Sequence, residues 1–136
     1  MAADEYDDEL QRIREEKLRR MQAAAVRPKP GQVVVITDAT LQQALRDHPR
    51  VLIDFWAEWC GPCRMVGPVV EALASEYAGR MVVGKCNTDE NPHTARQLMI
   101  TAIPTLMLFS HGQPADRIVG ALPKEAIRSR IERAFF

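Results

Sequence analysis

The stretch from residue 51 to residue 68 constrains the fold of this chain more than any other. It opens with a short, bounded and β-rich apolar run, Val51 to Trp56, which is typical of a central strand buried on both faces of a sheet. Gly61 allows a turn, and Pro62 then falls in the first turn of a helix, where its missing N–H costs nothing. The stretch therefore predicts a buried strand that leads through a tight turn into a helix.

Two cysteines at the start of this helix indicate disulfide chemistry. Cys60 lies at the predicted helix N-terminus, where unpaired N–H groups and the positive end of the helix dipole favour a thiolate. Cys63 follows three residues later and faces the same side, one turn deeper. We expect an exposed, acidified Cys60 thiol and a covered Cys63 partner within bonding reach. Such a pair can exchange disulfides with another molecule.

The residues around this pair resemble those of the thioredoxin family. The motif Trp59-Cys60-Gly61-Pro62-Cys63 is similar to the active-site motif of that family. Further matches follow in the family's order along the chain: Asp54-Phe55-Trp56-Ala57, Pro68, Lys85, Ile103-Pro104-Thr105 and Val119-Gly120. The similarity covers residues 31–136. It implies an α/β thioredoxin fold, with a central mixed five-stranded sheet flanked by four helices, plus an N-terminal helix.

The order of apolar runs and turn residues agrees with this fold. Asp38 or Thr37 is expected to cap the helix that follows the first strand, and Pro68 to kink the helix that begins at Cys60. Asn91 and Pro92 open a further short helix. The expected strands cover residues 33–36, 51–56, 81–85, 105–109 and 117–119.

Residues 1–30 are predicted to form a charged, amphipathic helical extension and a linker to the domain at 31–136. The helix is expected from residue 7 to about residue 26, and prolines and a glycine end it. An isolated helix of this length is marginal in water, so we expect it to pack on the domain, pair with a second copy, or fray. It is either a docking or targeting element or a solvated tail. Wound at 100° per residue, its apolar residues fall within an arc of about 140°: Leu10, Ile13, Leu18, Met21, Ala24 and Ala25.

The charge balance excludes some classes of partner. The 136 residues include 18 basic and 18 acidic ones, so the formal net charge is zero. No global field attracts nucleic acid or an anionic membrane, and we expect neither as a partner. The charged start of the chain contains no apolar segment of the length that a signal peptide or a membrane span needs. We therefore expect a cytoplasmic protein.

Zinc binding is the main alternative for the two cysteines. A structural zinc site takes four ligands, usually as two close pairs. Three cysteines are also too few for a secreted disulfide scaffold. We therefore expect no metal at this site and interpret Cys60 and Cys63 as redox-active. The other candidate ligands lack the spacing of a second pair: Cys86, His48, His93 and His111.

The resemblance assigns roles to four residues. It implies that Cys60 attacks a substrate disulfide and that Cys63 resolves the mixed disulfide, which releases the reduced substrate. Asp54 is a carboxylate within an apolar strand, and its pKa is expected to be raised because burial disfavours the charged form. In the family the matching aspartate helps to deprotonate the second cysteine, and a lysine at the position of Lys85 pairs with it. The alternative is an Asp54 that is merely tolerated or structurally paired.

A contact face for substrates is expected around the disulfide. Pro104 matches the family's cis-proline, which faces the two cysteines, and an ordinary trans proline is the alternative. In the family the backbone beside this proline binds the substrate strand through main-chain hydrogen bonds. A small, flat, apolar face of this kind suits many protein partners. Its expected members are Trp59, Gly61, Pro62, Ala102, Ile103, Pro104, Gly120 and Ala121.

The third cysteine, Cys86, has no counterpart in the motif. It follows Lys85 at the end of a predicted strand, where a free cysteine is usually a small buried hydrophobe. A regulatory or glutathionylated thiol is the alternative. Trp56, Phe55 and Phe109 are expected in the core.

The resemblance implies a protein-disulfide reductase that serves electron transport and cell redox homeostasis. Its expected partners are disulfide-containing proteins and an electron donor of the thioredoxin reductase type, and no cofactor is expected on this chain. We expect a monomer, although the sequence leaves open whether two copies pair through the N-terminal helix. Two other functions also stay open. One is a disulfide isomerase or oxidant, and the other is a redox scaffold that this helix directs to one partner.

Overall fold

The computed structural model describes residues 3–25 and 29–136. Within these ranges the chain forms five helices and five strands. In order they are α1 (Ala3–Ala25), β1 (Val33–Val35), α2 (Leu41–Asp47), β2 (Arg50–Trp56), α3 (Gly61–Glu76), β3 (Val82–Asn87), α4 (Pro92–Gln97), β4 (Thr105–Ser110), β5 (Gln113–Val119) and α5 (Lys124–Phe135).

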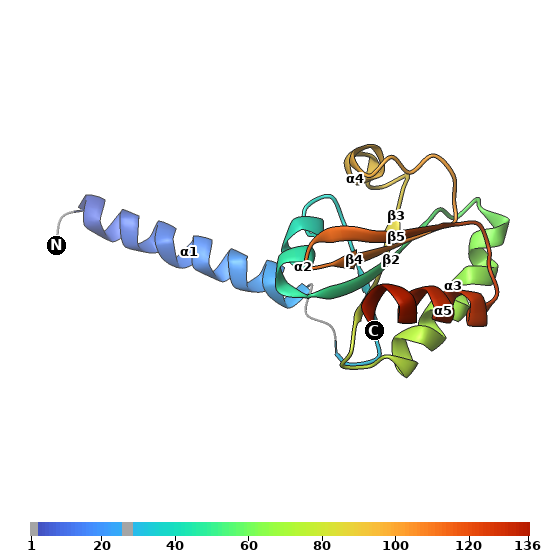
Figure 1. The fold of residues 1–136 in the computed structure, drawn as a ribbon. Coiled ribbons are helices and arrows are strands. Elements are labelled where there is room, and N and C mark those ends of the chain that lie inside the picture. The colour runs from blue at the N-terminus through green and yellow to red at the C-terminus, as the bar shows by residue number, and fades with distance from the viewer. Residues whose placement is uncertain (1–2, 26–28) are drawn as a thin grey trace.

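The strands form one mixed sheet in the order β1-β3-β2-β4-β5, which confirms the predicted five-stranded arrangement. Strand β3 is parallel to both β1 and β2, whereas β4 is antiparallel to both β2 and β5. Helices α3 and α5 cover one face of the sheet, and α2 and α4 lie on the other side (Figure 1). Because β2 and β3 are parallel neighbours, the loops that follow them emerge at the same edge of the sheet.

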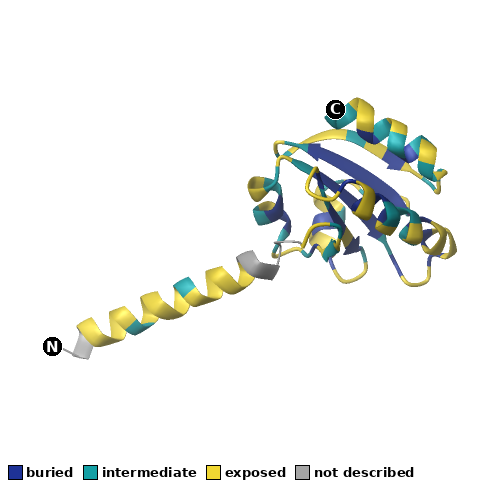
Figure 2. Cartoon of the chain, turned by 90° about the horizontal axis from the view of Figure 1, so that it is seen from below, coloured by how far each residue is buried: buried dark blue, intermediate teal, exposed yellow. Residues whose placement is uncertain are grey.

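Strand β2 runs through the centre of the sheet and contributes to two separate cores. Successive side chains of a strand point to opposite faces. Leu52 therefore packs with Val70 of α3 and Ile127 of α5 on one face. Its neighbour Ile53 packs on the other face with Leu41 of α2. Figure 2 shows the central strands as the most continuously buried part of the molecule.

Three expectations about element ends are wrong. Strand β3 continues to Asn87, two residues beyond its expected end at residue 85, because its pairing with β2 extends to Trp56. Strand β5 begins at Gln113 instead of residue 117, because the hairpin pairs Gln113 directly with Ser110 of β4. The N-cap of α2 is Thr40, and neither Asp38 nor Thr37 holds that position. The Asp38 carboxylate instead accepts the Thr94 N–H of α4 at 2.8 Å. Asp38 thus ties two segments together that are distant in sequence.

Helix α1 lies apart from the sheet in both views (Figures 1 and 2). Nearly all of its described side chains are exposed, including Ile13, Leu18 and Met21. Of the expected outcomes, packing on the domain is therefore not what the structure shows. The predicted apolar residues Ala24 and Ala25 have side chains outside the described part of the helix, and the expected helix end near residue 26 falls outside the described residues. None of the helices in the described ranges combines the length and apolarity needed to cross a lipid bilayer.

Candidate active site

Cys60 and Cys63 form a disulfide at the N-terminus of α3. Their Cα atoms lie 5.3 Å apart, within the usual range for a disulfide. Cys60 is the N-cap of the helix, and its sulfur accepts the Cys63 N–H at 3.3 Å. Pro62 occupies the first turn, as its sequence position predicts, and Pro68 lies inside the helix. The turn from β2 into α3 therefore brings the two sulfurs together at the positive end of a helix dipole.

The expected difference in exposure between the two cysteines is wrong for this disulfide form. Cys60 is 3% exposed and Cys63 is 5% exposed, so both are buried. Formation of the S–S bond puts each sulfur against the other and removes surface from both. The residue that remains open is the preceding one, because Trp59 is 71% exposed.

A cavity of about 420 Å³ lies beneath Cys63, and Asp54 of β2 lines it. The Asp54 carboxyl is buried, and its Oδ1 atom accepts no hydrogen bond in the described structure. Burial in this site raises the pKa of Asp54 to about 7, an effect that the positive charge of Lys85 partly opposes. A carboxyl with this pKa changes its protonation state near neutral pH beside one of the two cysteines.

Lys85 is the direct neighbour of Asp54 on β3 and lines the same cavity. The expected ion pair between them is not among the ion pairs of the described residues. The Lys85 ammonium instead lies 5.4 Å from the centre of the Trp56 ring, a cation–π arrangement. The Trp56 ring is partly exposed and also lines the cavity, so its expected place in the closed core is only partly right.

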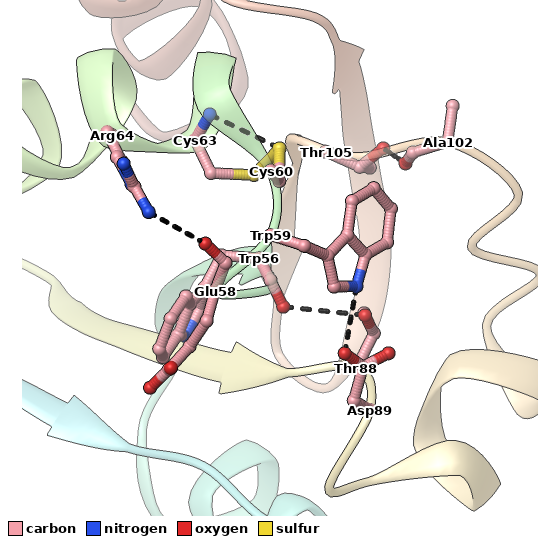
Figure 3. The surroundings of a disulfide bond; sticks show 10 residues. All are labelled: Trp56, Glu58, Trp59, Cys60, Cys63, Arg64, Thr88, Asp89, Ala102 and Thr105. Carbon is pink, nitrogen blue, oxygen red and sulfur yellow. Dashed lines mark hydrogen bonds between the residues drawn. A yellow bond between two sulfur atoms is a disulfide. The ribbon is translucent and has the colours of Figure 1, made fainter.

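Three interactions around the disulfide involve residues that the sequence did not single out (Figure 3). The Trp59 indole N–H donates to the Asp89 carboxylate at 2.9 Å, and Arg64 donates to the Glu58 carbonyl at 3.2 Å. Thr88 donates to the Trp56 carbonyl through its hydroxyl at 3.4 Å, the contact drawn in Figure 3, and through its backbone N–H at 2.9 Å. Asp89 lies in the loop after β3, and that loop emerges at the same sheet edge as the cysteines. No signal in the sequence pointed to this loop, because the predicted mixed sheet left open which strands pair.

The loop before β4 and the end of β5 lie side by side. The Ile103–Pro104 peptide bond is cis, which confirms the prediction. The Gly120 N–H donates to the Pro104 carbonyl at 2.9 Å, and the Thr105 hydroxyl donates to the Ala102 carbonyl at 2.6 Å. Gly120 has a φ of +98°, a conformation that glycine adopts without strain. Figure 3 shows Ala102 and Thr105 near the disulfide.

Cys86 lies apart from this site. It is fully buried and carries a free thiol on the face of the sheet that α2 covers. Burial raises the pKa of this thiol to about 12, and the nearby negative charge of Asp38 adds to the effect. The prediction of a small buried hydrophobe is confirmed for Cys86.

Comparison with known proteins identifies the family. The Thioredoxin family model matches residues 32–133, which is most of the chain. The chain belongs to the thioredoxin family. Thioredoxin 1 of a Nostoc species is 52% identical over 99 residues, which are 72% of this chain and 92% of that protein. A thioredoxin of a Synechocystis species is 50% identical over 99 residues, with the same shares covered. A solved mutant thioredoxin from Halobacterium salinarum has a TM-score of 0.74 and 34% identity, and the match covers 80% of this chain and 96% of that one.

Thioredoxins are thiol–disulfide oxidoreductases that act on disulfide substrates and are reduced by thioredoxin reductase. The chain has the family's domain and a pair of cysteines that closes a disulfide at the family's active-site position. It is a thiol–disulfide oxidoreductase with protein-disulfide reductase function. The predicted family, fold and activity are thereby confirmed.

Proposed function

We propose that Cys60 is the attacking thiol of this reductase and that Cys63 is the resolving thiol. The observation that carries this proposal is the position of the Cys60 sulfur at the N-cap of α3, where it accepts a backbone N–H. A thiolate at a helix N-terminus is stabilised by the helix dipole and by such donors. Cys63 lies one turn further along, above the cavity, and is within bonding distance of Cys60.

In the proposed reaction two electrons pass from the cysteine pair to the substrate. The Cys60 thiolate attacks one sulfur of a substrate disulfide, and the other substrate sulfur leaves as a thiolate. Cys63 then loses its proton and attacks the Cys60 sulfur in the mixed disulfide. The second substrate thiolate leaves and is protonated, and a Cys60–Cys63 disulfide remains. The substrate is reduced, and the cysteine pair is oxidised.

We propose that Asp54 accepts the proton of Cys63 and that Lys85 adjusts how readily it does so. Both residues line the cavity beneath Cys63, and the pKa of Asp54, about 7, suits a group that takes up and releases protons near neutral pH. Lys85 lowers the pKa of Asp54 through its charge and not through a direct ion pair. Water in the cavity is the proposed carrier of the proton, since the cavity exceeds the volume of one water molecule.

We propose that substrates bind across the surface around the disulfide. Trp59 is 71% exposed, and its hydrogen bond to Asp89 holds the indole ring in place. The neighbouring backbone at Ile103 offers main-chain groups to an extended substrate segment. The other proposed members are Gly61, Pro62, Pro104 and Gly120.

The natural partners that we propose are disulfide-containing proteins and a thioredoxin reductase of the same compartment. We propose a cytoplasmic location with roles in electron transport and cell redox homeostasis. The charged start of the chain supports the proposed location, although a similar thioredoxin M-type of Pisum sativum, 41% identical over 104 residues, is described as chloroplastic. We also propose that residues 1–30 act separately from the domain at 31–136. The exposure of α1 supports this division.

The proposed roles are tested by trapping the mixed disulfide. Cys63→Ser should accumulate a covalent complex with a disulfide-containing model protein through Cys60, because no thiol remains to resolve it. Cys60→Ser should form no such complex and should have no reductase activity. Cys86→Ala is the matched control, since it removes a cysteine outside the site and should leave both reactions unchanged. A complex that forms through Cys63 in Cys60→Ser would reverse the assignment.

A further inference from the structure

Helix α1 has an exposed apolar face that the domain does not cover. At 100° per residue, Tyr6, Leu10, Ile13 and Met21 fall within an arc of about 80°. Tyr6, Ile13 and Met21 are each more than half exposed, and Leu10 is partly exposed. Most helices in proteins are stabilised by packing an amphipathic face, whereas the described part of this 23-residue helix leaves its apolar face exposed. We therefore expect a partner to cover this apolar face.

The charges of α1 are divided between its two halves. From Glu5 to Glu9 the described side chains include four acidic residues and no basic one. From Arg12 to Arg20 basic residues outnumber acidic ones. Two copies of this helix in parallel would place like charges side by side. Two copies in antiparallel orientation would place the acidic half of each against the basic half of the other.

We infer that α1 pairs with the α1 of a second copy of this chain, in antiparallel orientation and through the face of Tyr6, Leu10, Ile13 and Met21. With the twofold axis between residues 13 and 14, Tyr6 lies opposite Met21, and Ile13 lies near its own copy. Lys17 interrupts the face. Its aliphatic stem covers the apolar face beside Leu10 of the other copy, while its ammonium reaches out toward the edge of the pair.

Glu9 and Arg20 lie along one edge of this apolar face. In an antiparallel pair with this axis the same edges of the two helices meet. Glu9 of one copy then comes within about 3 Å, measured along the helix axis, of the level of Arg20 in the other copy. Within its own helix the Arg20 guanidinium donates to Glu16 at 2.5 Å, and a guanidinium has further donors for a second carboxylate. Two such contacts form by symmetry.

The chain also contains matched controls for these two residues. Asp8 and Arg19 have the same charges as Glu9 and Arg20 and directly precede them, but they lie on the opposite side of the helix from the apolar face.

Because the domain follows the C-terminal end of α1, antiparallel pairing sets the two domains at opposite ends of a helix pair about 35 Å long. Both active sites then remain open to substrates, which gives a reductase with two separate sites.

Sedimentation of the full chain under reducing conditions tests this inference. The wild-type chain is expected to dimerise with rising concentration and to dissociate as salt is added. Ile13→Glu should abolish the dimer. Glu9→Lys and Arg20→Glu should each weaken it about tenfold, because each places like charges at two symmetric contacts. An equimolar mixture of these two variants should restore dimerisation, since Lys at 9 then meets Glu at 20. Asp8→Lys and Arg19→Glu should have little effect.

Three outcomes would overturn the inference. If the wild-type chain stays monomeric up to about 1 mM, the dissociation constant of the pair is too high for dimerisation, and a different partner covers the face. A dimer that Ile13→Glu does not affect uses another surface. If the chain is a monomer and Ile13→Glu lowers the stability of its domain, the α1 face packs against the domain of the same chain. Far-ultraviolet circular dichroism of each variant checks that α1 stays helical, and the reductase activity of all variants should remain at the wild-type value.

Discussion

Neighbouring residues of one strand face two different environments across the sheet. On the α3 side of β2, Asp54 opens onto a cavity with Cys63 and Lys85. On the α2 side, Ile53 and Phe55 are fully buried among apolar side chains. The alternation of a strand thus keeps a titratable group one residue away from a closed core. The sequence run from Val51 to Trp56 is apolar apart from Asp54, and Asp54 lies on the face of the sheet that holds the cavity and Cys63.

The same contrast separates two thiols. Cys63 lines the cavity together with Asp54, its proposed proton acceptor, whereas Cys86 lies on the closed face, where burial raises its pKa to about 12. A thiol reacts through its thiolate, so a thiol with this pKa is inert at neutral pH. The side of the sheet on which a cysteine lies therefore determines whether its thiol is available for exchange.

The largest expected effect concerns the open face. The pKa of Asp54 is about 7 in the folded protein and is 3.8 for an ordinary aspartate. The folded state therefore holds the proton more tightly, and the charged group costs stability as pH rises from about 4 through 7, by about 4 kcal/mol in total. Asp54→Asn should raise the free energy of unfolding by about this amount near pH 9 and change it little near pH 4. Urea denaturation of the oxidised protein at both pH values measures it.

The same variant should also slow resolution of the mixed disulfide near neutral pH, because Cys63 then lacks its proposed proton acceptor. The effect should shrink at alkaline pH, because hydroxide then removes the Cys63 proton without the help of Asp54. Unchanged turnover in Asp54→Asn at neutral pH would contradict the proposed role, even if the gain in stability were observed.

The next effect concerns the closed face. Ile53 is fully buried beside Asp54 on the same strand. Ile53→Ala should lower the free energy of unfolding by about 3 kcal/mol at every pH, because it leaves a cavity that the sheet cannot close. Ile53→Val is the matched control and should cost about 1 kcal/mol. A strongly pH-dependent loss for Ile53→Ala would show that the two faces are not independent.

A smaller effect is expected where β3 passes close to Ile36. A Cβ atom added at Gly84 would lie 2.6 Å from Ile36 Cγ1, which is too close for two carbons. Gly84→Ala should therefore cost about 2 kcal/mol of stability. Gly67→Ala in α3 is the matched control, since its Cβ would meet nothing within 4 Å. The gain from replacing a helical glycine is offset because Pro68 disfavours helical backbone at a preceding residue with a Cβ, so Gly67→Ala should change stability by less than about 1 kcal/mol. Thermal unfolding of both variants checks the pair.

The smallest effect is expected at Cys86. Cys86→Ala should cost about 1 kcal/mol of stability, as a small buried group is deleted, and should leave the reductase activity unchanged. A bulky thiol reagent should modify no third thiol in the folded, reduced protein. Rapid labelling of Cys86 would instead favour a regulatory thiol at this position.

Local rules predicted the parts of the site that lie close together in sequence. Gly61 and Pro62 between the cysteines predicted the turn and the helix start, and the structure has both. The cis bond at Pro104 came from the family resemblance and is confirmed. These features depend on a few consecutive residues, so a pattern of residue types is enough to find them.

Contacts across the fold were the ones that the sequence did not reveal. Trp59 binds Asp89, 30 residues away, and Asp38 binds Thr94, 56 residues away. No local pattern encodes such partners, because the register of the sheet brings them together. The Lys85 ammonium is a further example, because its place 5.4 Å from the centre of the Trp56 ring is a contact between two neighbouring strands.

A redox titration with cysteine-specific mass spectrometry tests the account most directly. The protein is equilibrated at a series of potentials, denatured and alkylated, and the state of each cysteine is read from its peptide. We predict that Cys60 and Cys63 change together with one midpoint, near the value of about −270 mV known for thioredoxin, while Cys86 stays a free thiol throughout. A midpoint near −120 mV, about that of a strong oxidant, or a disulfide that includes Cys86, would contradict the account.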